Sequence, residues 1–203
     1  MKETIERIDA LQRHYDSSDT PEMHERGDLI RHTLVKDLEH YRALLATEMG
    51  ESGRDAYFEG RDSLGAKARI PWVRWASISR SPSAQRGWFV VYLFHPSGVG
   101  VSLCLMHGAT DIINNEFIPK SAAATARFNA FALATLGDYF SGDANVRRGI
   151  DLGRGAGLPS YYERAVVFSK FYPAERIPED AALVADLRLF ARALAKLYLA
   201  KSD

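Results

Sequence analysis

The sequence predicts an α+β fold, with a central antiparallel sheet flanked by N-terminal and C-terminal helices. Apolar residues in the first and last parts of the chain recur every three or four positions, which is typical of helices that bury one side. The middle of the chain instead holds runs of β-branched and aromatic residues, which favour strands. At 203 residues the chain has the size of one domain, so we expect residues 1–203 to fold as a single unit.

Residues 1–50 are predicted to be helical. Apolar side chains follow helical spacing between residues 5 and 15 and again between residues 30 and 45. Thr20 followed by Pro21 is a typical helix start, because the threonine hydroxyl can accept from a backbone N–H and proline needs no N–H there. The second helix should therefore begin at Pro21 and continue until the glycines at positions 50 and 53.

The predicted sheet lies between residues 56 and 110. The run YFEGR precedes a glycine-containing loop, and the runs WVRWASI, WFVVYLF and VGVSLCLM follow, the last two joined by the turn residues HPSG. Along WFVVYLF, Phe89 and Leu93 point to one face, and Trp88 and Tyr92 to the other. Because both faces are apolar, we expect this strand to be covered on both sides, or to line a pocket on one side.

Residues 119–203 are predicted to contain a helix, a loop, a strand and a C-terminal helix. Ser121 can cap the first of these helices. The stretch from Ser141 to Pro159 is rich in glycine and is expected to be a loop, and YYERAVVFSKFY has the composition of a strand. Pro178, followed by two acidic residues, is typical of the start of the final helix.

Composition limits the class of protein. The one cysteine, Cys104, lies in an apolar run and is expected to be a buried strand residue, which excludes a disulfide within the chain. No apolar run is long enough to cross a bilayer, and the charged N-terminus does not resemble a secretory signal. We therefore expect a cytoplasmic protein with no membrane partner.

Charge is distributed unevenly, although the formal net charge is zero. No Asp or Glu occurs from Ser63 to Thr110, whereas this stretch holds five basic residues, Lys67, Arg69, Arg74, Arg80 and Arg86. A surface of this kind can bind phosphates even on a neutral protein. The loop SRSPSAQRG adds the hydroxyls of Ser81 and Ser83, which suits phosphate contact, although a plain solvated loop is equally compatible.

Sequence signatures of catalysis are missing. The chain has no GxxxxGK[ST] phosphate loop and no GxSxG elbow, and the acid-free central stretch cannot supply the acidic ligands of a two-metal nuclease. His24, His32 and His40 recur every eight residues, which turns each by about 80° on a helix and suits no shared metal ion. We expect a protein that is not an enzyme and binds neither a metal nor a cofactor.

Aromatic residues alternate with arginines in the central stretch, from Trp72 to Phe94. Proteins that hold an unstacked base need this combination, because a base stacks on an aromatic ring while Arg and Lys bind the flanking phosphates. The alternative interpretation is structural, since aromatics along a strand are usually part of a core.

The sequence resembles the N-terminal domain of McrB-like modification-dependent restriction proteins over essentially its whole length. The matching segments are TPEMHERGDLIRHTL, EGRDSLGAKARIPWVRW, SPSAQRGWFVVYLF, GVGVSLCLMHGAT, IDLG and YYERAVVFSKFYPAERIPED. The central segments are specific as a set. The resemblance implies a DNA-binding specificity domain that flips a modified cytosine into a pocket, while other domains or subunits translocate and cleave.

The resemblance also assigns positions to the pocket. Trp72 looks like an aromatic of the pocket wall, Phe89 occupies the position of a tyrosine that stacks on the flipped base, and Leu93 shares the face of Phe89. The loop before IPW contributes to the family's pocket, but here it carries Leu64 and Gly65 instead of an aromatic. This departure leaves two interpretations: a pocket with Leu64 that accepts a different cytosine modification, or a protein that reads another feature of DNA.

These observations predict a module that recognises 5-methylcytosine or a related modified cytosine by base flipping, and targets a restriction or phage-defence effector. Its partners would be double-stranded DNA with a modified base and a fused or separate ATPase or nuclease. The predicted contacts to the DNA backbone are Lys67, Arg69, Arg74, Arg80, Ser81, Ser83 and Arg86. Two alternatives remain, a sensor domain for a nucleotide or small ligand and a structural or oligomerisation domain.

Overall fold

A six-stranded antiparallel sheet forms the centre of the computed structural model, which describes residues 1–63, 66–114, 116–153 and 157–200. The strand order is β1-β2-β3-β4-β8-β7, and every pair of neighbours is antiparallel. The strands are β1 (Ala56–Arg61), β2 (Trp72–Ser77), β3 (Trp88–Phe94), β4 (Gly100–His107), β7 (Val146–Arg148) and β8 (Val166–Pro173). This sheet, with helices at both ends of the chain, confirms the predicted α+β class.

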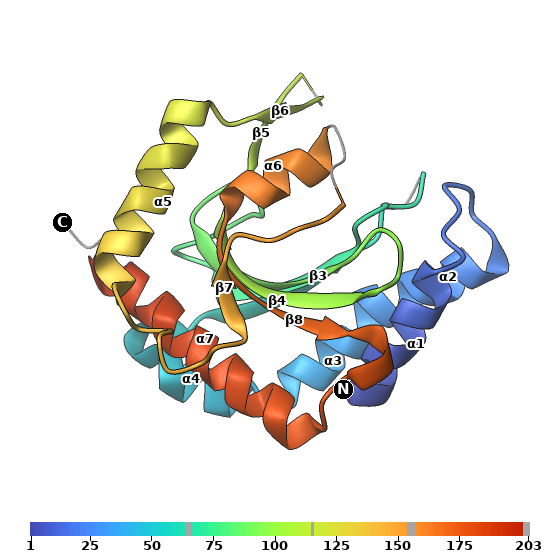
Figure 1. Ribbon diagram of the computed structural model, residues 1–203, viewed down its shortest axis with the longest axis horizontal. Coiled ribbons are helices and arrows are strands. Elements are labelled where there is room, and N and C mark those ends of the chain that lie inside the picture. The colour runs from blue at the N-terminus through green and yellow to red at the C-terminus, as the bar shows by residue number, and fades with distance from the viewer. Residues whose placement is uncertain (64–65, 115, 154–156, 201–203) are drawn as a thin grey trace.

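Helices from both ends of the chain cover one face of the sheet, which we call the first face (Figure 1). They are α1 (Lys2–Gln12), α2 (Pro21–Asp28), α3 (Leu34–Glu39), α4 (Arg42–Met49) and α7 (Asp180–Ala200). Trp75, Trp88 and Tyr92 are buried beneath them. Thr20 caps α2 as predicted, since its hydroxyl accepts from the Met23 N–H at 3.3 Å.

The helix predicted to run on from Pro21 is interrupted twice. A π turn, Leu29–Thr33, separates α2 from α3, and Tyr41 has φ −96° and ψ 11°, which ends the helical path before α4. At the π turn the backbone of β1 approaches so closely that a Cβ at Gly60 would lie 2.0 Å from the Ile30 carbonyl oxygen. The first interruption thus coincides with close packing against β1, which the helical spacing of the sequence does not reveal.

The opposite, second face of the sheet carries a shorter helix, α6 (Leu158–Ala165), and the segment 149–152. Helix α5 (Ala122–Leu136) lies at the side of the sheet and is capped by Ser121, as predicted. Two predictions were wrong here. The glycine-rich stretch contains the short strand β7, and the first half of YYERAVVFSKFY is helical because Pro159 lies in the first turn of α6.

A second, two-stranded sheet consists of β5 (Thr110–Ile113) and β6 (Glu116–Pro119), which the sequence did not predict. Its strands pair with each other and project from the rest of the molecule (Figure 1). In the central sheet, all seven residues of β3 are buried, which confirms that this strand is covered on both sides. Among the described residues, no helix is long and apolar enough to cross a membrane.

One carboxylate is buried on α1 without a partner. Asp9 is 1% exposed, and neither of its oxygens accepts a hydrogen bond within the described parts of the chain. Burial raises the pKa of Asp9 from 3.8 to about 8, and the charge of Arg13 offsets only part of this rise. Asp9 is therefore protonated in the folded protein at neutral pH.

Stability should fall as the pH rises towards 8. The unfolded chain releases the Asp9 proton near pH 4, whereas the folded chain keeps it to about pH 8. The contribution of Asp9 to the free energy of unfolding is therefore complete below pH 4 and is lost between pH 4 and pH 8. The loss is at most about 1.4 kcal/mol per pH unit. We expect Asp9→Asn to be more stable than the wild type at pH 8 and equal to it at pH 4. Urea unfolding at both values measures this, and an Asp9→Asn gain that does not change with pH would contradict it.

Candidate nucleic-acid interface

Three of the residues predicted to hold a base, Trp72, Phe89 and Leu93, lie on the second face of the sheet. Phe89, Val91 and Leu93 point to this face from β3, and Trp72 lies directly opposite Leu93 on β2. Trp88 and Tyr92 belong to the core of the first face. The alternation expected from the sequence is thus confirmed for β3, and Trp72, Phe89 and Leu93 do share a face.

The three residues do not meet at one point. Trp72 and Leu93 are neighbours in the register, at the end of the sheet next to the loop that joins β1 to β2. Phe89 lies four residues further along β3, about 13 Å away at the usual rise of a strand. A single flipped base that stacks on Trp72 therefore lies close to Leu93 and far from Phe89.

Helix α6 and the segment 149–152 cover this face. Tyr161, Tyr162, Ile150 and Leu152 pack against the apolar residues of the second face, and Phe89 and Leu93 are only 4% and 2% exposed. Trp72 is half-buried and lies at the rim. Trp72 thus keeps part of its surface exposed, whereas Phe89 and Leu93 are closed off by this cover.

Tyr162 is a site residue that the sequence analysis missed. Burial raises the pKa of Tyr162, and a hydrogen bond between its side chain and that of Trp72 partly offsets the rise. The sequence analysis missed Tyr162 because the composition of its segment favours a strand. Tyr162 points towards Trp72 because the segment is helical. Pro159, in the first turn of α6, was the available signal.

Arg74, a predicted backbone contact, is buried between the sheet and the loop after β2. Its guanidinium pairs with the Glu59 carboxylate at 2.9 Å and lies 5.4 Å from the centre of the Phe89 ring. It also donates to the backbone and hydroxyl oxygens of Ser81 at 3.3 Å. In this structure Arg74 therefore holds the loop from Ile78 to Gly87 against the sheet, and its charge is already neutralised.

The other residues of that loop differ in exposure. Ser81 is buried, and its hydroxyl donates to the Arg86 carbonyl at 2.7 Å. Ser83 is half-buried and accepts from the Gln85 N–H, whereas the side chains of Arg80 and Arg86 are exposed. Arg80 and Arg86 are thus the basic residues of this loop whose side chains are exposed to solvent.

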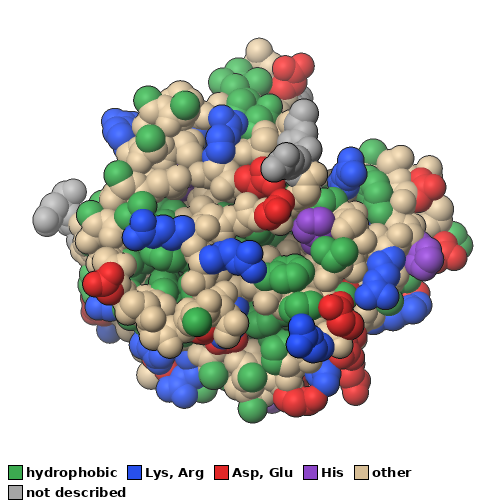
Figure 2. All heavy atoms as spheres, in the orientation of Figure 1, with side chains coloured by type: hydrophobic (Ala, Val, Ile, Leu, Met, Phe, Trp, Pro, Cys, Tyr) green, Lys and Arg blue, Asp and Glu red, His purple; other side chains and the backbone are tan. Residues whose placement is uncertain are grey.

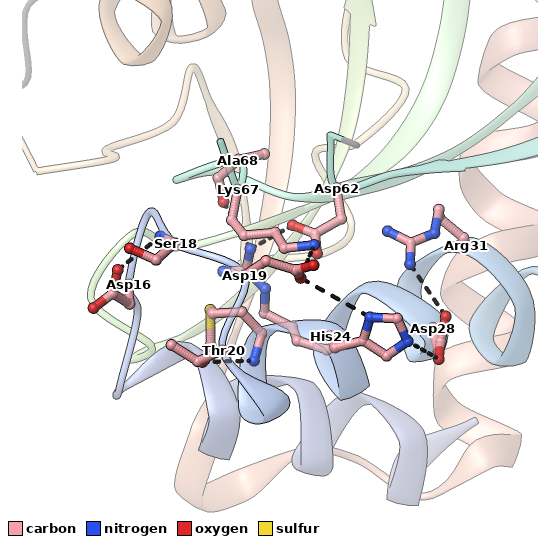
Figure 3. A network of polar contacts seen from close by, with 12 residues as sticks. Asp16, Ser18, Asp19, Thr20, His24, Asp28, Arg31, Asp62, Lys67 and Ala68 are labelled. Carbon is pink, nitrogen blue, oxygen red and sulfur yellow. Dashed lines mark hydrogen bonds and ion pairs between the residues drawn. The ribbon is translucent and has the colours of Figure 1, made fainter. Parts of the chain in front are cut away.

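Lys67 and Arg69 belong to the loop at the opposite end of β2, between β1 and β2. The Lys67 ammonium is buried and pairs with Asp19 at 2.7 Å (Figure 3). Arg69 is exposed. Leu64 and Gly65, two predicted pocket residues, lie outside the described residues.

A buried network fixes this loop to the N-terminal helices. Arg26 is fully buried, pairs with the buried Asp62, and donates to Gln12 at 2.5 Å and to the Ala68 carbonyl at 3.0 Å. Gln12 in turn donates to the carbonyls of Arg69 and Pro96, at 3.0 and 3.2 Å. The path of the chain into Trp72 is therefore set by α1 and α2.

Backbone hydrogen bonds and an aromatic contact also attach the loop between β1 and β2 to the N-terminal segment. The Lys67 N–H donates to the Ser17 carbonyl, and the Tyr15 hydroxyl donates to the Lys67 carbonyl, both at 2.9 Å. The Arg26 guanidinium lies 5.4 Å from the centre of the Tyr15 ring. Figure 3 shows the segment from Asp16 to Thr20 lying against Lys67 and Ala68.

The histidines do not gather at this interface as metal ligands. His24 lies between two carboxylates, with its ring nitrogens 3.9 Å from Asp19 and 3.4 Å from Asp28 (Figure 3). Within the parts of the chain that the structure describes, no group of three or more His, Cys, Asp and Glu side chains is arranged to hold a metal ion.

Comparison with known proteins gives one match. A family model described as the MrcB-like, N-terminal domain matches residues 10–199, which is nearly the whole chain. No curated protein and no solved structure matches the chain.

Removal of one partner from the buried pair should strongly destabilise the fold. Arg26→Met leaves the Asp62 carboxylate buried and unpaired, so we expect a loss of about 3–5 kcal/mol in the free energy of unfolding. The double variant Arg26→Met/Asp62→Leu removes both charges and should recover much of this loss. Urea unfolding at pH 7 measures the three proteins.

The matched control is Arg7→Met, which breaks the exposed pair between Arg7 on α1 and Glu25 on α2. It should change stability little, since solvent screens this pair. Equal effects of Arg26→Met and Arg7→Met, or a double variant less stable than Arg26→Met, would contradict the assigned role of Arg26.

Proposed function

The chain belongs to the family of MrcB-like N-terminal domains. Because this family points to a DNA-binding domain of a restriction system, we propose that the chain recognises a modified cytosine in double-stranded DNA. The family match over residues 10–199 is the observation that carries the proposal. The resemblance in sequence had predicted this membership. The proposed role is targeting, in the cytoplasm, of a fused or separate ATPase or nuclease.

The base is proposed to enter at Trp72. This aromatic is half-buried at the rim of the second face, Leu93 lies opposite it, and Tyr162 of α6 lies beside it. Extrusion of a base from a duplex costs a few kcal/mol, and stacking on an aromatic side chain can return about 1–3 kcal/mol. Once the cover formed by α6 and the segment 149–152 moves aside, a methyl group of the base would gain further from contact with Leu93.

The phosphates are proposed to contact arginines at both ends of β2. Arg69 lies in the loop before this strand, and Arg80 and Arg86 lie in the loop after it, with all three side chains exposed. A strand of this length separates its two ends by about 17–20 Å, which corresponds to five or six base pairs along a duplex. The paired charges of Lys67 and Arg74 would act instead by holding the two loops in place.

We also propose that the domain performs no chemistry itself. Trp72 and Leu93 on the second face and the exposed Arg69 in the loop before β2 suit binding of a base and its phosphates. Cleavage and translocation would belong to the effector.

The burial of Phe89 favours the alternative interpretation, in which the aromatic residues of the central stretch are core residues. At 4% exposure, this side chain behaves as a core residue, and Phe89→Ala should cost about 3–5 kcal/mol of stability. The proposal therefore depends on Trp72, which is half-buried, and not on Phe89.

The central test is a binding panel of matched duplexes that carry cytosine, 5-methylcytosine, hydroxymethylcytosine, N4-methylcytosine or N6-methyladenine at one position. We expect one modified cytosine to bind at least about tenfold more tightly than cytosine, a difference of about 1.4 kcal/mol. Trp72→Ala should remove this preference while keeping residual binding through phosphates, and Trp72→Phe should retain part of it. Fluorescence anisotropy gives the affinities.

Leu199→Ala serves as the control, because Leu199 is exposed on α7, which covers the first face. Equal affinity of the wild type for modified and unmodified duplexes would overturn the proposal. Stabilisation by a free nucleotide without duplex binding would favour the sensor alternative instead.

Salt dependence tests the phosphate contacts separately. Each of Arg69→Gln and Arg86→Gln should weaken binding to all duplexes alike and reduce the slope of log affinity against log salt by about 1. Arg7→Gln, on the exposed surface of α1, should leave the slope unchanged. If neither arginine variant changes the slope, the phosphates bind elsewhere.

A further inference from the structure

The cover of the second face is the connection between two neighbouring strands of the sheet. The chain leaves β7, crosses the second face as the segment 149–152, and returns through α6 into β8, which pairs with β7. Figure 1 shows both parts of the cover on the same side of the sheet, with α6 continuing directly into β8. The cover is therefore attached to the sheet at its two ends, which lie on adjacent strands.

Hydrogen bonds to backbone groups fix the two ends of the cover. The Gly149 N–H donates to the Val167 carbonyl at 3.0 Å, and the Gly149 carbonyl accepts from the Ser169 hydroxyl. At the other end, the Asn129 side chain of α5 donates to the Arg164 carbonyl at 3.0 Å. A movement of the cover that keeps these bonds turns it about its two ends, away from the second face.

One side chain of α6 joins the two parts of the cover. Figure 2 shows acidic side chains where Figure 1 draws the cover, and the acidic residues of the cover are Asp151 and Glu163. Asp151 accepts from the Gly153 N–H at 2.9 Å, next to it in the chain, whereas Glu163 accepts from the Leu152 N–H at 2.8 Å. The Leu152 side chain is 2% exposed and belongs to the apolar cluster of the second face. Glu163 thus holds Leu152 in place over this face.

Other contacts between the cover and the sheet are made by side chains. Ile150, Tyr161 and Tyr162 pack against the apolar cluster, and Tyr162 also forms a hydrogen bond with Trp72. These contacts can break without the loss of a backbone hydrogen bond in the sheet. The cover can therefore open while the sheet and the helices of the first face keep their structure.

We propose that Glu163 is a latch that holds the cover closed, and that the cover must open before a base can contact Leu93. The proposal rests on the proposed function and adds the step that controls entry of the base. Leu93 is 2% exposed beneath the cover, so only an open state offers this side chain to a ligand. Where the binding-competent state is a minor one, the apparent affinity falls in proportion to its population. Loss of the latch should therefore raise the population of the open state and the affinity for the base by the same factor.

Cys104 can report the opening, because it is the one cysteine of the chain and lies in the same apolar cluster as Leu152. Its neighbours in the register are Val91 on β3 and Ser169 on β8. Burial raises the pKa of the Cys104 thiol, so the closed protein reacts slowly with a small aromatic disulfide. Opening of the cover exposes the thiol, and the labelling rate then follows the population of the open state.

The first measurement is the rate of Cys104 labelling under native conditions, without DNA. We expect Glu163→Ala to label about tenfold faster than the wild type, the effect of losing one hydrogen bond to a charged group. Glu163→Gln should label at nearly the wild-type rate, because its amide oxygen can still accept from the Leu152 N–H. The matched control is Glu48→Ala, which removes a carboxylate that joins α4 to α7 on the first face, and it should leave the rate unchanged.

The second measurement uses the duplexes of the binding panel. Glu163→Ala should bind the preferred modified duplex about tenfold more tightly than the wild type, and the unmodified duplex with equal affinity. Glu163→Gln removes the same negative charge but keeps the acceptor, so it should bind both duplexes as the wild type does. A gain in affinity shared by both variants and both duplexes would come from the lost charge and would contradict the latch.

Three further outcomes would overturn the latch. In the first, Glu163→Ala labels at the wild-type rate. In the second, Glu163→Ala and Glu48→Ala accelerate labelling alike, which means that the thiol reacts through unfolding of the whole domain. In the third, Glu163→Ala labels faster but binds the modified duplex no more tightly, so the base does not need the open cover, and the proposed function stays intact.

The proposed function has a separate point of failure. A wild type that binds no duplex would remove it, and with it the role of the cover in base entry, whatever the labelling rates show. Because labelling is measured without DNA, a failure of the latch and a failure of duplex binding are distinguishable.

Discussion

The buried ion pair between Arg26 and Asp62 constrains the parts of the structure that face a ligand. Burial lowers the pKa of Arg26 and raises that of Asp62, so desolvation of the two charges outweighs their attraction. The pair therefore adds little net stability. Its contribution is specificity, because the guanidinium and the groups it binds leave one arrangement of α2, the end of β1 and the loop that leads to Trp72.

Strand β3 links the two faces of the sheet, because its side chains alternate between the two apolar cores. Tyr92 packs beneath the helices of the first face, while Leu93 lies opposite Trp72 on the second. A shift that would open the second face at β3 also disturbs the aromatic core on the first. Opening for a base is therefore expected in the cover, in α6 and the segment 149–152, and not in the sheet.

The features of this structure that depend on neighbouring residues in the sequence could be predicted, whereas those that depend on tertiary packing could not. Strands β1 to β4 and β8, the caps at Thr20 and Ser121 and the two faces of β3 follow from neighbouring residues, and they were predicted. Strands β5, β6 and β7 were not predicted. Helix α6 was missed because its tyrosines favour a strand, and the helix is settled by Pro159 and by packing on the second face. The pairing of Lys67 with Asp19 was beyond prediction, because these residues meet only after α2 has packed against the loop.

The loop before Trp72 and the β5–β6 hairpin depend on the core in different ways. The loop before Trp72 is tied to α1 and α2 by buried charge, so a change that alters recognition there also alters stability. The β5–β6 hairpin pairs with itself, and its apolar side chains are exposed, so they contribute little to folding. Exposed apolar surface that does not stabilise the fold invites aggregation, and its presence on a projecting ribbon is most simply explained by a partner that buries it.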